Sequence, residues 1–359
     1  MSNPYKNLEQ MQYWSSYRKG ILKDNLITDI WQPKFEITSQ SQIATFGSCF
    51  AQHISNALRC NGYNWVCTEN LPVSVSDDLA KELGYRNFSC RTGNIYTTSM
   101  LNQWVDWSLD IKDMPPEIWL YKGRYYDPIR PNIENVGFES LEECRAMREV
   151  TKLSFARCVK QADVFVFTLG LTEAWVNKDM GYEYPICPQA LKMSPPECQS
   201  EFINYDYERV KANLVYALEK IRQVNPNIKI LLTVSPVPLI ATHLPSHVMV
   251  ATSAAKSILR AVCDSVKETS NCIDYFPSYE IISNPFSSTD FFALDKRSVT
   301  TEGVTNVMQY FFDAIGDTKS GQSKVTNNIP LNQSKDNFDQ TICEEELLLA
   351  FIKEQGLPI

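Results

Sequence analysis

The sequence is poor in histidine and contains no long apolar run. Its 359 residues include three histidines, His53, His243 and His247, so a hydrolytic triad has few candidates for its base. His243 and His247 have the spacing of a helical metal pair, but Pro245 between them opposes a helix, so we expect no metal site. No apolar stretch is long enough to span a bilayer, and the first residues lack the apolar core of a signal peptide. We therefore expect no membrane span and a cytoplasmic location.

Basic charge and paired cysteines are also scarce. The chain has 34 lysines and arginines against 42 acidic residues, a net charge of -8, and no basic stripe stands out. Because binding to nucleic-acid phosphates depends on such a stripe, we expect no nucleic-acid partner. The 11 cysteines include no C-x-x-C pair, which is typical of thiols in a reducing compartment. We expect no cofactor.

What the sequence does contain is an alternation of strand and helix patterns. This order predicts an α/β fold with a largely parallel sheet covered on both faces. The expected strands are 43–47, 63–67, 163–170, 228–234 and 272–276. The expected helices are 51–58, a helix through Leu101 and Trp104, 141–160, 207–224, 251–267 and 301–312.

Composition divides the chain into four parts. Residues 1–38 are expected to form an N-terminal lead-in packed on the main domain, which spans 39–315. Residues 316–338 have the polar composition of a flexible linker. Residues 339–359 contain a short amphipathic helix, acidic at its start and basic toward its end. This helix packs back on the domain or docks on a protein partner.

The segment from Ile43 to Ala51 contains the most informative motif, GSCFA. A short apolar run ends at Gly47, and the spacing from Ala51 to Leu58 is helical. Ser48 therefore lies at a strand's carboxyl end and a helix's amino end, where backbone N–H groups can hold an oxyanion. The alternative is a turn with a helix N-cap and no chemistry.

Several further blocks occur in order with this motif, and together they resemble the GSCFA-domain family, which is similar to SGNH or GDSL hydrolases. The resemblance covers about residues 28–315. The matching blocks are 31–35, 47–54, 93–97, 168–175, 235–238 and 255–257, with sequences WQPKF, GSCFAQHI, GNIYT, TLGLTEAW, SPVP and AKS.

The resemblance implies a three-layer α/β/α sandwich with a mostly parallel sheet and makes 39–315 a catalytic domain. It implies that Ser48 is the nucleophile and that the oxyanion is held by the Ser48 N–H together with backbone and side-chain donors from two further blocks. Gly93, or Asn94 beside it, matches the second block. Thr172 matches the third, where the wider superfamily usually has asparagine, and its hydroxyl reaches less far than an amide.

The last block departs from the family pattern. SGNH-like enzymes usually carry D-x-x-H, with the histidine as general base, whereas Asp295 is followed three residues later by Ser298. A serine hydroxyl cannot replace that base. Either His247 serves as the base, or the protein binds its ligand without turnover, or the block is misplaced. Glu173 and Asp295 are the carboxylates considered for orienting an imidazolium.

Two functions follow as hypotheses. The first is a serine esterase or O-acyltransferase that acts on an acylated glycan or similar ester through an acyl-Ser48 intermediate, with Ser48, His247 and Asp295 as catalytic residues. The carbohydrate comes from the resemblance, because family members are connected with surface polysaccharide synthesis. The second is a non-catalytic SGNH-like binding or scaffold module.

Overall fold

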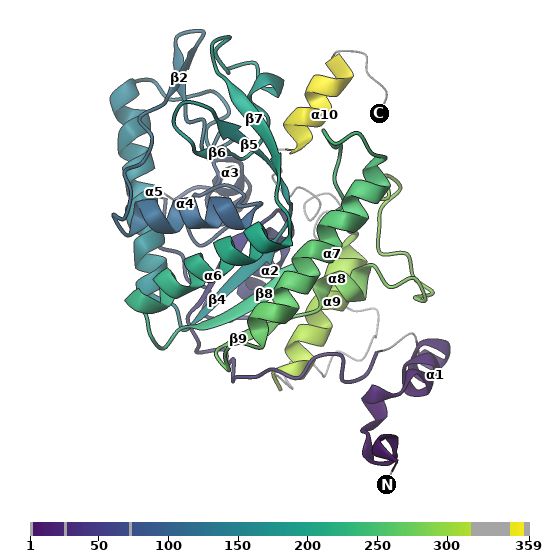
Figure 1. The fold of residues 1–359 in the computed structure, drawn as a ribbon. Helices are drawn as coiled ribbons and strands as arrows, with labels where there is room; N and C mark the ends of the chain where they lie inside the picture. The colour runs from purple at the N-terminus through teal and green to yellow at the C-terminus, as the bar shows by residue number, and fades with distance from the viewer. Residues whose placement is uncertain (1–2, 25–26, 72–73, 317–344, 355–359) are drawn as a thin grey trace.

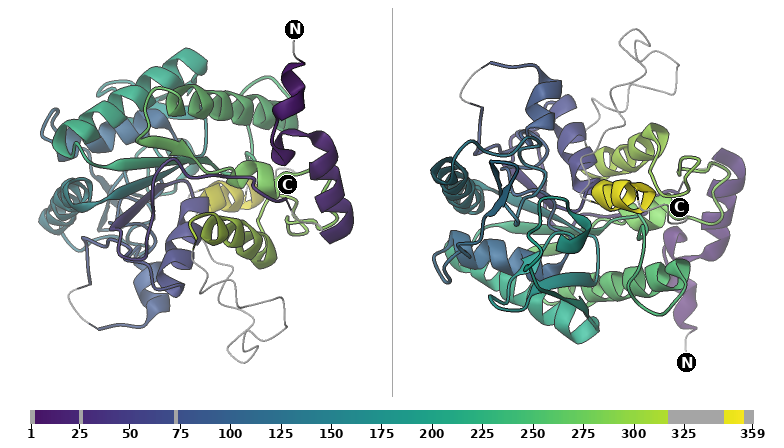
Figure 2. Two further views of the ribbon diagram at one scale, coloured as in Figure 1. Left: turned by 90° about the horizontal axis from the view of Figure 1, so that it is seen from below. Right: turned by 90° about the horizontal axis from the view of Figure 1, so that it is seen from above.

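The computed structural model describes residues 3–24, 27–71, 74–316 and 345–354. At its centre is a sheet of four parallel strands, in the order β1–β4–β8–β9 (Figure 1). The strands are β1 (Ile43–Gly47), β4 (Val164–Leu169), β8 (Lys229–Val234) and β9 (Ile273–Tyr275). Helices cover both faces, so the predicted three-layer α/β fold with a parallel sheet is confirmed (Figure 2).

The two helical layers differ in size. One face is covered by α4 (Thr98–Ser108), α5 (Leu141–Gln161), α6 (Tyr207–Val224) and α7 (Val248–Lys267). The other face carries α2 (Phe50–Cys60), α8 (Ser278–Ile282) and α9 (Thr301–Ala314). Because each connection returns the chain to the same edge, all four strands end on one side of the molecule.

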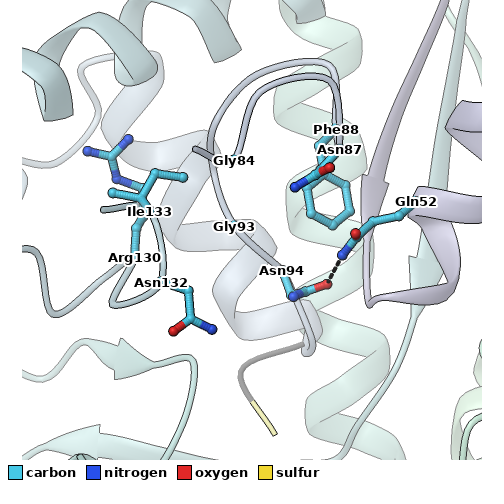
Figure 3. A pocket seen from close by; sticks show the side chains of 9 residues that line it. All are labelled: Gln52, Gly84, Asn87, Phe88, Gly93, Asn94, Arg130, Asn132 and Ile133. Carbon is cyan, nitrogen blue, oxygen red and sulfur yellow. Dashed lines mark hydrogen bonds between the residues drawn. The ribbon is translucent and has the colours of Figure 1, made fainter. Parts of the chain in front are cut away.

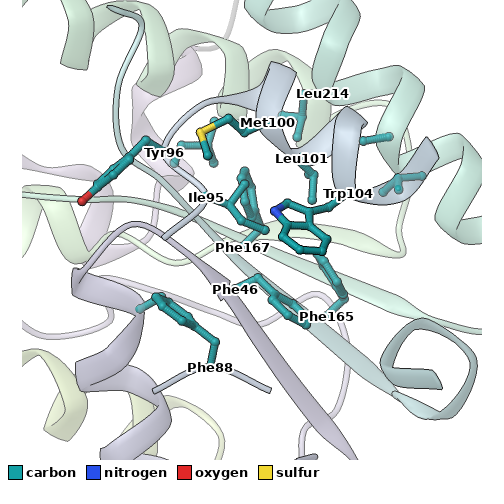
Figure 4. Close-up of a cluster of buried hydrophobic side chains, with 14 of the residues drawn as sticks. Phe46, Phe88, Ile95, Tyr96, Met100, Leu101, Trp104, Phe165, Phe167 and Leu214 are labelled. Atoms are coloured by element: carbon teal, nitrogen blue, oxygen red, sulfur yellow. The ribbon is translucent and has the colours of Figure 1, made fainter. Parts of the chain in front are cut away.

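Alternate residues of each strand supply the two cores. Phe46, Phe165 and Phe167 face the α4–α7 layer and pack with Trp104 of α4 (Figure 4). Their neighbours, including Val164 and Val166, belong to the second core. Because β4 is buried on both faces, its sequence is apolar except for Thr168, which is why it was predictable.

Two small antiparallel sheets extend this framework, and the sequence did not predict them. They are β2 (Trp119–Tyr121) with β3 (Arg124–Tyr126), and β5 (Glu173–Asn177) flanked by β6 (Glu183–Tyr184) and β7 (Ser200–Asn204). Strands this short carry too little alternation to be recognised. The strand expected at 63–67 is reduced to one bridge, between Ile43 and Trp65. A short helix, α3 (Asp77–Glu82), follows this segment.

The N-terminal residues contact the body at several points, among them Tyr17, Ile27 and Trp31. Trp31 is buried, stacks on Phe311 of α9 at 5.5 Å between ring centroids, and donates a 3.1 Å hydrogen bond to Asp274. The preceding elements stand beside the body, with Trp14 exposed (Figure 1). They are η1 (Pro4–Asn7), η2 (Gln10–Gln12) and α1 (Trp14–Asp24).

The C-terminal helix, α10 (Glu345–Glu354), lies on the side where the parallel strands end (Figure 2). Its Leu347 and Leu348 pack against the larger core, and Glu354 pairs with Lys192 just after η3 (Pro188–Ala190). The predicted linker falls almost entirely outside the described residues. None of the helices in the described ranges is both long and apolar enough to cross a bilayer.

Candidate functional site

Ser48 is placed by a tight junction between β1 and β4. Gly47 pairs in register with Thr168, and its φ of 130° is a conformation that favours glycine. A β-carbon at Gly47 would lie 2.3 Å from the Thr168 carbonyl oxygen. The Ser48 amide donates to that same oxygen at 3.0 Å. Only glycine allows the chain to turn from strand to helix here.

The Ser48 hydroxyl is buried and unpartnered. Ser48 is 2% exposed, and among the described residues no hydrogen-bond partner reaches its Oγ. Buried hydroxyl groups are almost always hydrogen-bonded in folded proteins. An unsatisfied hydroxyl at the end of a parallel strand, where α/β proteins bind ligands, therefore marks a candidate site.

The structure brings three of the sequence blocks together around Ser48. A β-carbon at Gly170 would lie 2.8 Å from Ser48 Cβ, so the third block touches the serine. The amides of Gly170 and Leu171 both donate to the Tyr96 carbonyl oxygen, at 3.0 and 2.9 Å. The Ile95 amide in turn donates to the Gly47 carbonyl oxygen at 2.8 Å, which joins the second block to the first.

Gly93 and Asn94 line a small pocket beside the amino end of α2 (Figure 3). Gln52, one helical turn after Ser48, lines the same pocket and donates to Asn94 Oδ1 at 3.3 Å. The Asn87 amide lies on the same side as Gln52, and the Asn132 amide lies across the pocket from them. The pocket is lined by Gln52, Gly84, Asn87, Phe88, Gly93, Asn94, Arg130, Asn132 and Ile133.

The hydrogen bonds of the amides around Ser48 differ from those that the resemblance implies. The Ser48 amide is engaged by Thr168, and the Ala51 and Gln52 amides donate to Ser48 and Cys49 carbonyl oxygens. Since the first amides of a helix have no acceptor within it, the amides of Cys49 and Phe50 are the remaining donors of that turn. Sequence comparison alone pointed to Ser48 N–H instead.

Thr172 and Glu173 form other hydrogen bonds. The Thr172 hydroxyl donates to Asn204 Oδ1 at 2.8 Å, so its one proton is committed to β7. Glu173 accepts from the Thr242 hydroxyl at 2.5 Å and from the His243 amide at 3.2 Å. In this structure Glu173 holds the loop after β8, and its role toward an imidazolium stays a prediction.

The three histidines occupy different surroundings, and none is hydrogen-bonded to Ser48 Oγ. His247 is exposed as the N-cap of α7, where its Nδ1 accepts from the Met249 amide at 3.2 Å. His243 is exposed and packs its ring against Phe202 and Trp175, on β7 and β5. His53 is half-buried on α2 and contacts Phe50 edge to face.

Asp295 and Ser298 form a closed turn. The Asp295 carboxylate accepts from the Ser298 hydroxyl at 2.6 Å and from the Arg297 and Ser298 amides at 2.9 Å. Partial burial raises the pKa of Asp295, but these hydrogen bonds lower it more, so it lies below its usual value. The Arg297 side chain donates to the Pro238 carbonyl oxygen, which places this turn beside the loop after β8.

Gln52 and Lys256 lie in the matching sequence blocks, but neither of them was assigned a role at the site from the sequence. Gln52 follows Ser48 by four residues, which places it over the same helical face. Lys256 is 1% exposed, and Leu259 and Cys263, three and seven residues later, are also buried. A lysine at an apolar helical position was a recognisable signal.

Comparison with known proteins gives one family. A family model described as the GSCFA family matches residues 42–311, which is most of the chain. No curated protein and no solved structure matches the chain. The matched range contains β1, β4, β8 and β9 together with Ser48 and the blocks that surround it.

Proposed function

The chain belongs to the GSCFA family, and from this premise we propose that it is a serine esterase or O-acyltransferase. Its substrate is an acylated glycan or a similar ester, and the acyl group is carried on Ser48. The observation that supports the proposal is the buried Ser48 Oγ just before α2, which has no hydrogen-bond partner within the part of the chain that the structure describes. A hydroxyl without a partner is available to a substrate carbonyl, and helix amides next to it favour the negative charge that develops there.

The reaction has two steps. Ser48 Oγ forms a bond to the acyl carbon, the bond to the alcohol oxygen breaks, and the hydroxyl proton passes through a base to the leaving alcohol. Water or a sugar hydroxyl then attacks the acyl-serine and gives its proton to the same base, the bond from the acyl carbon to Ser48 Oγ breaks, and the base returns the proton to Ser48 Oγ. The Cys49 and Phe50 amides, with the Gly93 and Asn94 segment, hold the oxyanion in both steps.

A fluorophosphonate probe tests the nucleophile. We expect the full chain to be labelled on Ser48, with Ser48→Ala unlabelled and Cys49→Ala, the adjacent matched control, still labelled. Peptide mass spectrometry identifies the modified residue. Absence of labelling between pH 6 and 9 in a folded protein contradicts acyl transfer through Ser48.

The proposed base, His247, must change its hydrogen bonding to act. Its Nδ1 accepts an amide proton, so the neutral ring carries its own proton on Nε2 and has no other lone pair for the Ser48 proton. Catalysis through His247 requires its release from Met249. We expect His247→Ala to abolish labelling and His243→Ala and His53→Ala to retain it; an unchanged rate in His247→Ala removes His247 from the mechanism.

The second candidate function is a non-catalytic binding or scaffold module. The closed turn of Asp295 and Ser298 favours this function. Ser298 stands at the position of the usual base, and its hydroxyl already donates a hydrogen bond to the Asp295 carboxylate. For this function we expect no labelling of Ser48. Saturable binding of acylated oligosaccharides, measured by calorimetry, then weakens when Asn94 is replaced by alanine.

A further inference from the structure

Lys256 is a fully buried cation at the end of the sheet. It lies on α7, is 1% exposed, and donates a 2.8 Å hydrogen bond from Nζ to the Gly170 carbonyl oxygen. Lysine is almost never this buried, because removing an ammonium from water costs several kcal/mol unless other groups compensate. A lysine held in this place therefore points to a specific use of its charge.

The residue that accepts the Lys256 hydrogen bond, Gly170, lies against the candidate nucleophile. A β-carbon on Gly170 would lie 2.8 Å from Ser48 Cβ and 3.3 Å from the Tyr96 carbonyl oxygen. The Gly170 amide is bonded to that same Tyr96 oxygen, so the Lys256 contact fixes the other end of the Gly170 peptide segment. The ammonium is thus linked to Ser48 through a single residue.

We propose that Lys256 is a positioning residue for Ser48: it holds Gly170 against the serine and places a positive charge beside the nucleophile. The inference rests on the proposed acyl transfer and extends it to a residue outside the expected triad. In this role Lys256 acts as an ammonium group and forms no bond to substrate. Its charge favours the alkoxide character of Ser48 and the oxyanion, and this effect is strong in a site shielded from water.

A thiol in place of the serine measures this charge independently of catalysis. Ser48→Cys is made in a Cys49→Ala background, and its alkylation by iodoacetamide is followed between pH 6 and 10 by peptide mass spectrometry. A nearby cation stabilises the thiolate. We expect the alkylation midpoint to rise by at least about half a pH unit when Lys256→Met is added. Midpoints that agree within about 0.2 unit overturn the proposal.

Fluorophosphonate labelling of the native serine measures the consequence for reactivity. We expect Lys256→Met to label Ser48 about 10- to 100-fold more slowly than the unaltered chain, the loss expected when one electrostatic contact is removed. Lys229 begins β8 and so lies at the opposite end of the parallel sheet from Ser48. Lys229→Met is the matched control, and we expect its Ser48 to be labelled at the rate of the unaltered chain. Equal rates in a folded Lys256→Met variant overturn the proposal.

Two further variants keep the test decisive if Lys256→Met does not fold. Lys256→Arg retains the charge, and Lys256→Gln retains a donor for Gly170 without it. We expect the arginine variant to keep the low thiol midpoint and the glutamine variant to lose it; equal midpoints in the two overturn the proposal. If the unaltered chain is not labelled while the thiol midpoint shifts, acyl transfer fails and the placement of the charge is supported.

Discussion

The buried carboxylate of Glu183 accepts a 2.6 Å hydrogen bond from Thr97, the residue that caps α4. Its other oxygen accepts from the Tyr205 hydroxyl at 3.1 Å, and the Tyr205 amide donates to the Thr172 carbonyl oxygen. Glu183 therefore joins the segment after Asn94 to the segment after Gly170. Burial raises the pKa of Glu183 from about 4.5 to about 7, although hydrogen bonds from Thr97 and Tyr205 oppose the rise.

This raised pKa predicts that the protein loses stability as pH rises. Between about pH 4.5 and 7 the folded chain retains the Glu183 proton and the unfolded chain does not. The free energy of unfolding therefore falls across this window, by about 3 kcal/mol at most. We expect Glu183→Gln to lack that fall, as measured by urea unfolding at pH 5 and pH 8. The exposed Glu201→Gln is the control, and an unchanged pH dependence in Glu183→Gln contradicts the prediction.

Asp127 is expected to act in the opposite direction. It pairs with Arg130 at 2.8 Å and Arg148 at 2.7 Å, and all three side chains are buried. Burial raises the pKa of Asp127, but the two arginines lower it more, to about 2. Its contribution to stability is thus complete above about pH 3.8 and is lost as the pH falls toward 2.

Replacing Asp127 by asparagine leaves two buried guanidinium groups without their carboxylate. We expect a loss of about 3–5 kcal/mol in the free energy of unfolding at pH 7, measured in urea. Asp110→Asn is the matched control, because Asp110 pairs with Lys152 at 2.9 Å but is 79% exposed, and such pairs contribute about 0–1 kcal/mol. Similar losses in both variants contradict the prediction.

The contact between Gly170 and Ser48 predicts that an added methyl group displaces the serine. We expect Gly170→Ala to cost about 1–3 kcal/mol of stability. We also expect it to slow the labelling of Ser48 by more than the unfolded fraction of the variant accounts for. Gly303→Ala is the control. Gly303 lies on α9, and a β-carbon there would lie 2.9 Å from Phe291 Cβ, a similarly close contact. It should destabilise the fold without changing the labelling rate of the folded protein; equal rate losses in the two variants contradict a local effect at Ser48.

The C-terminal helix predicts a modest effect of truncation. Leu347 and Leu348 are half-buried against the core, and the pair of Glu354 with Lys192 is exposed. A chain that ends at Gly316 should therefore retain one cooperative thermal transition and lose no more than about 3 kcal/mol. Calorimetry of the two chains makes the comparison. Loss of the cooperative transition contradicts the view that the main domain folds without α10.

The parallel strands were predictable because a strand that is buried on both faces is a short segment rich in apolar residues. Val164–Leu169 is apolar except for Thr168, and the strand lies within the predicted 163–170. The short strands β5, β6 and β7 show no such apolar pattern, since their stability comes from pairing with one another. Their positions were decided by contacts between residues up to about 30 apart in sequence.

The sequence by itself determined the family, the α/β fold and the position of Ser48 between β1 and α2, because apolar period and turn chemistry are local. Only the tertiary structure decided what surrounds that serine. It set Gly170 against Ser48, committed Thr172 to Asn204, closed Asp295 on Ser298 and buried Lys256 beneath Gly170. Most of these contacts join residues that are far apart in the sequence, and all of them depend on how the side chains pack. A local residue pattern therefore does not predict them.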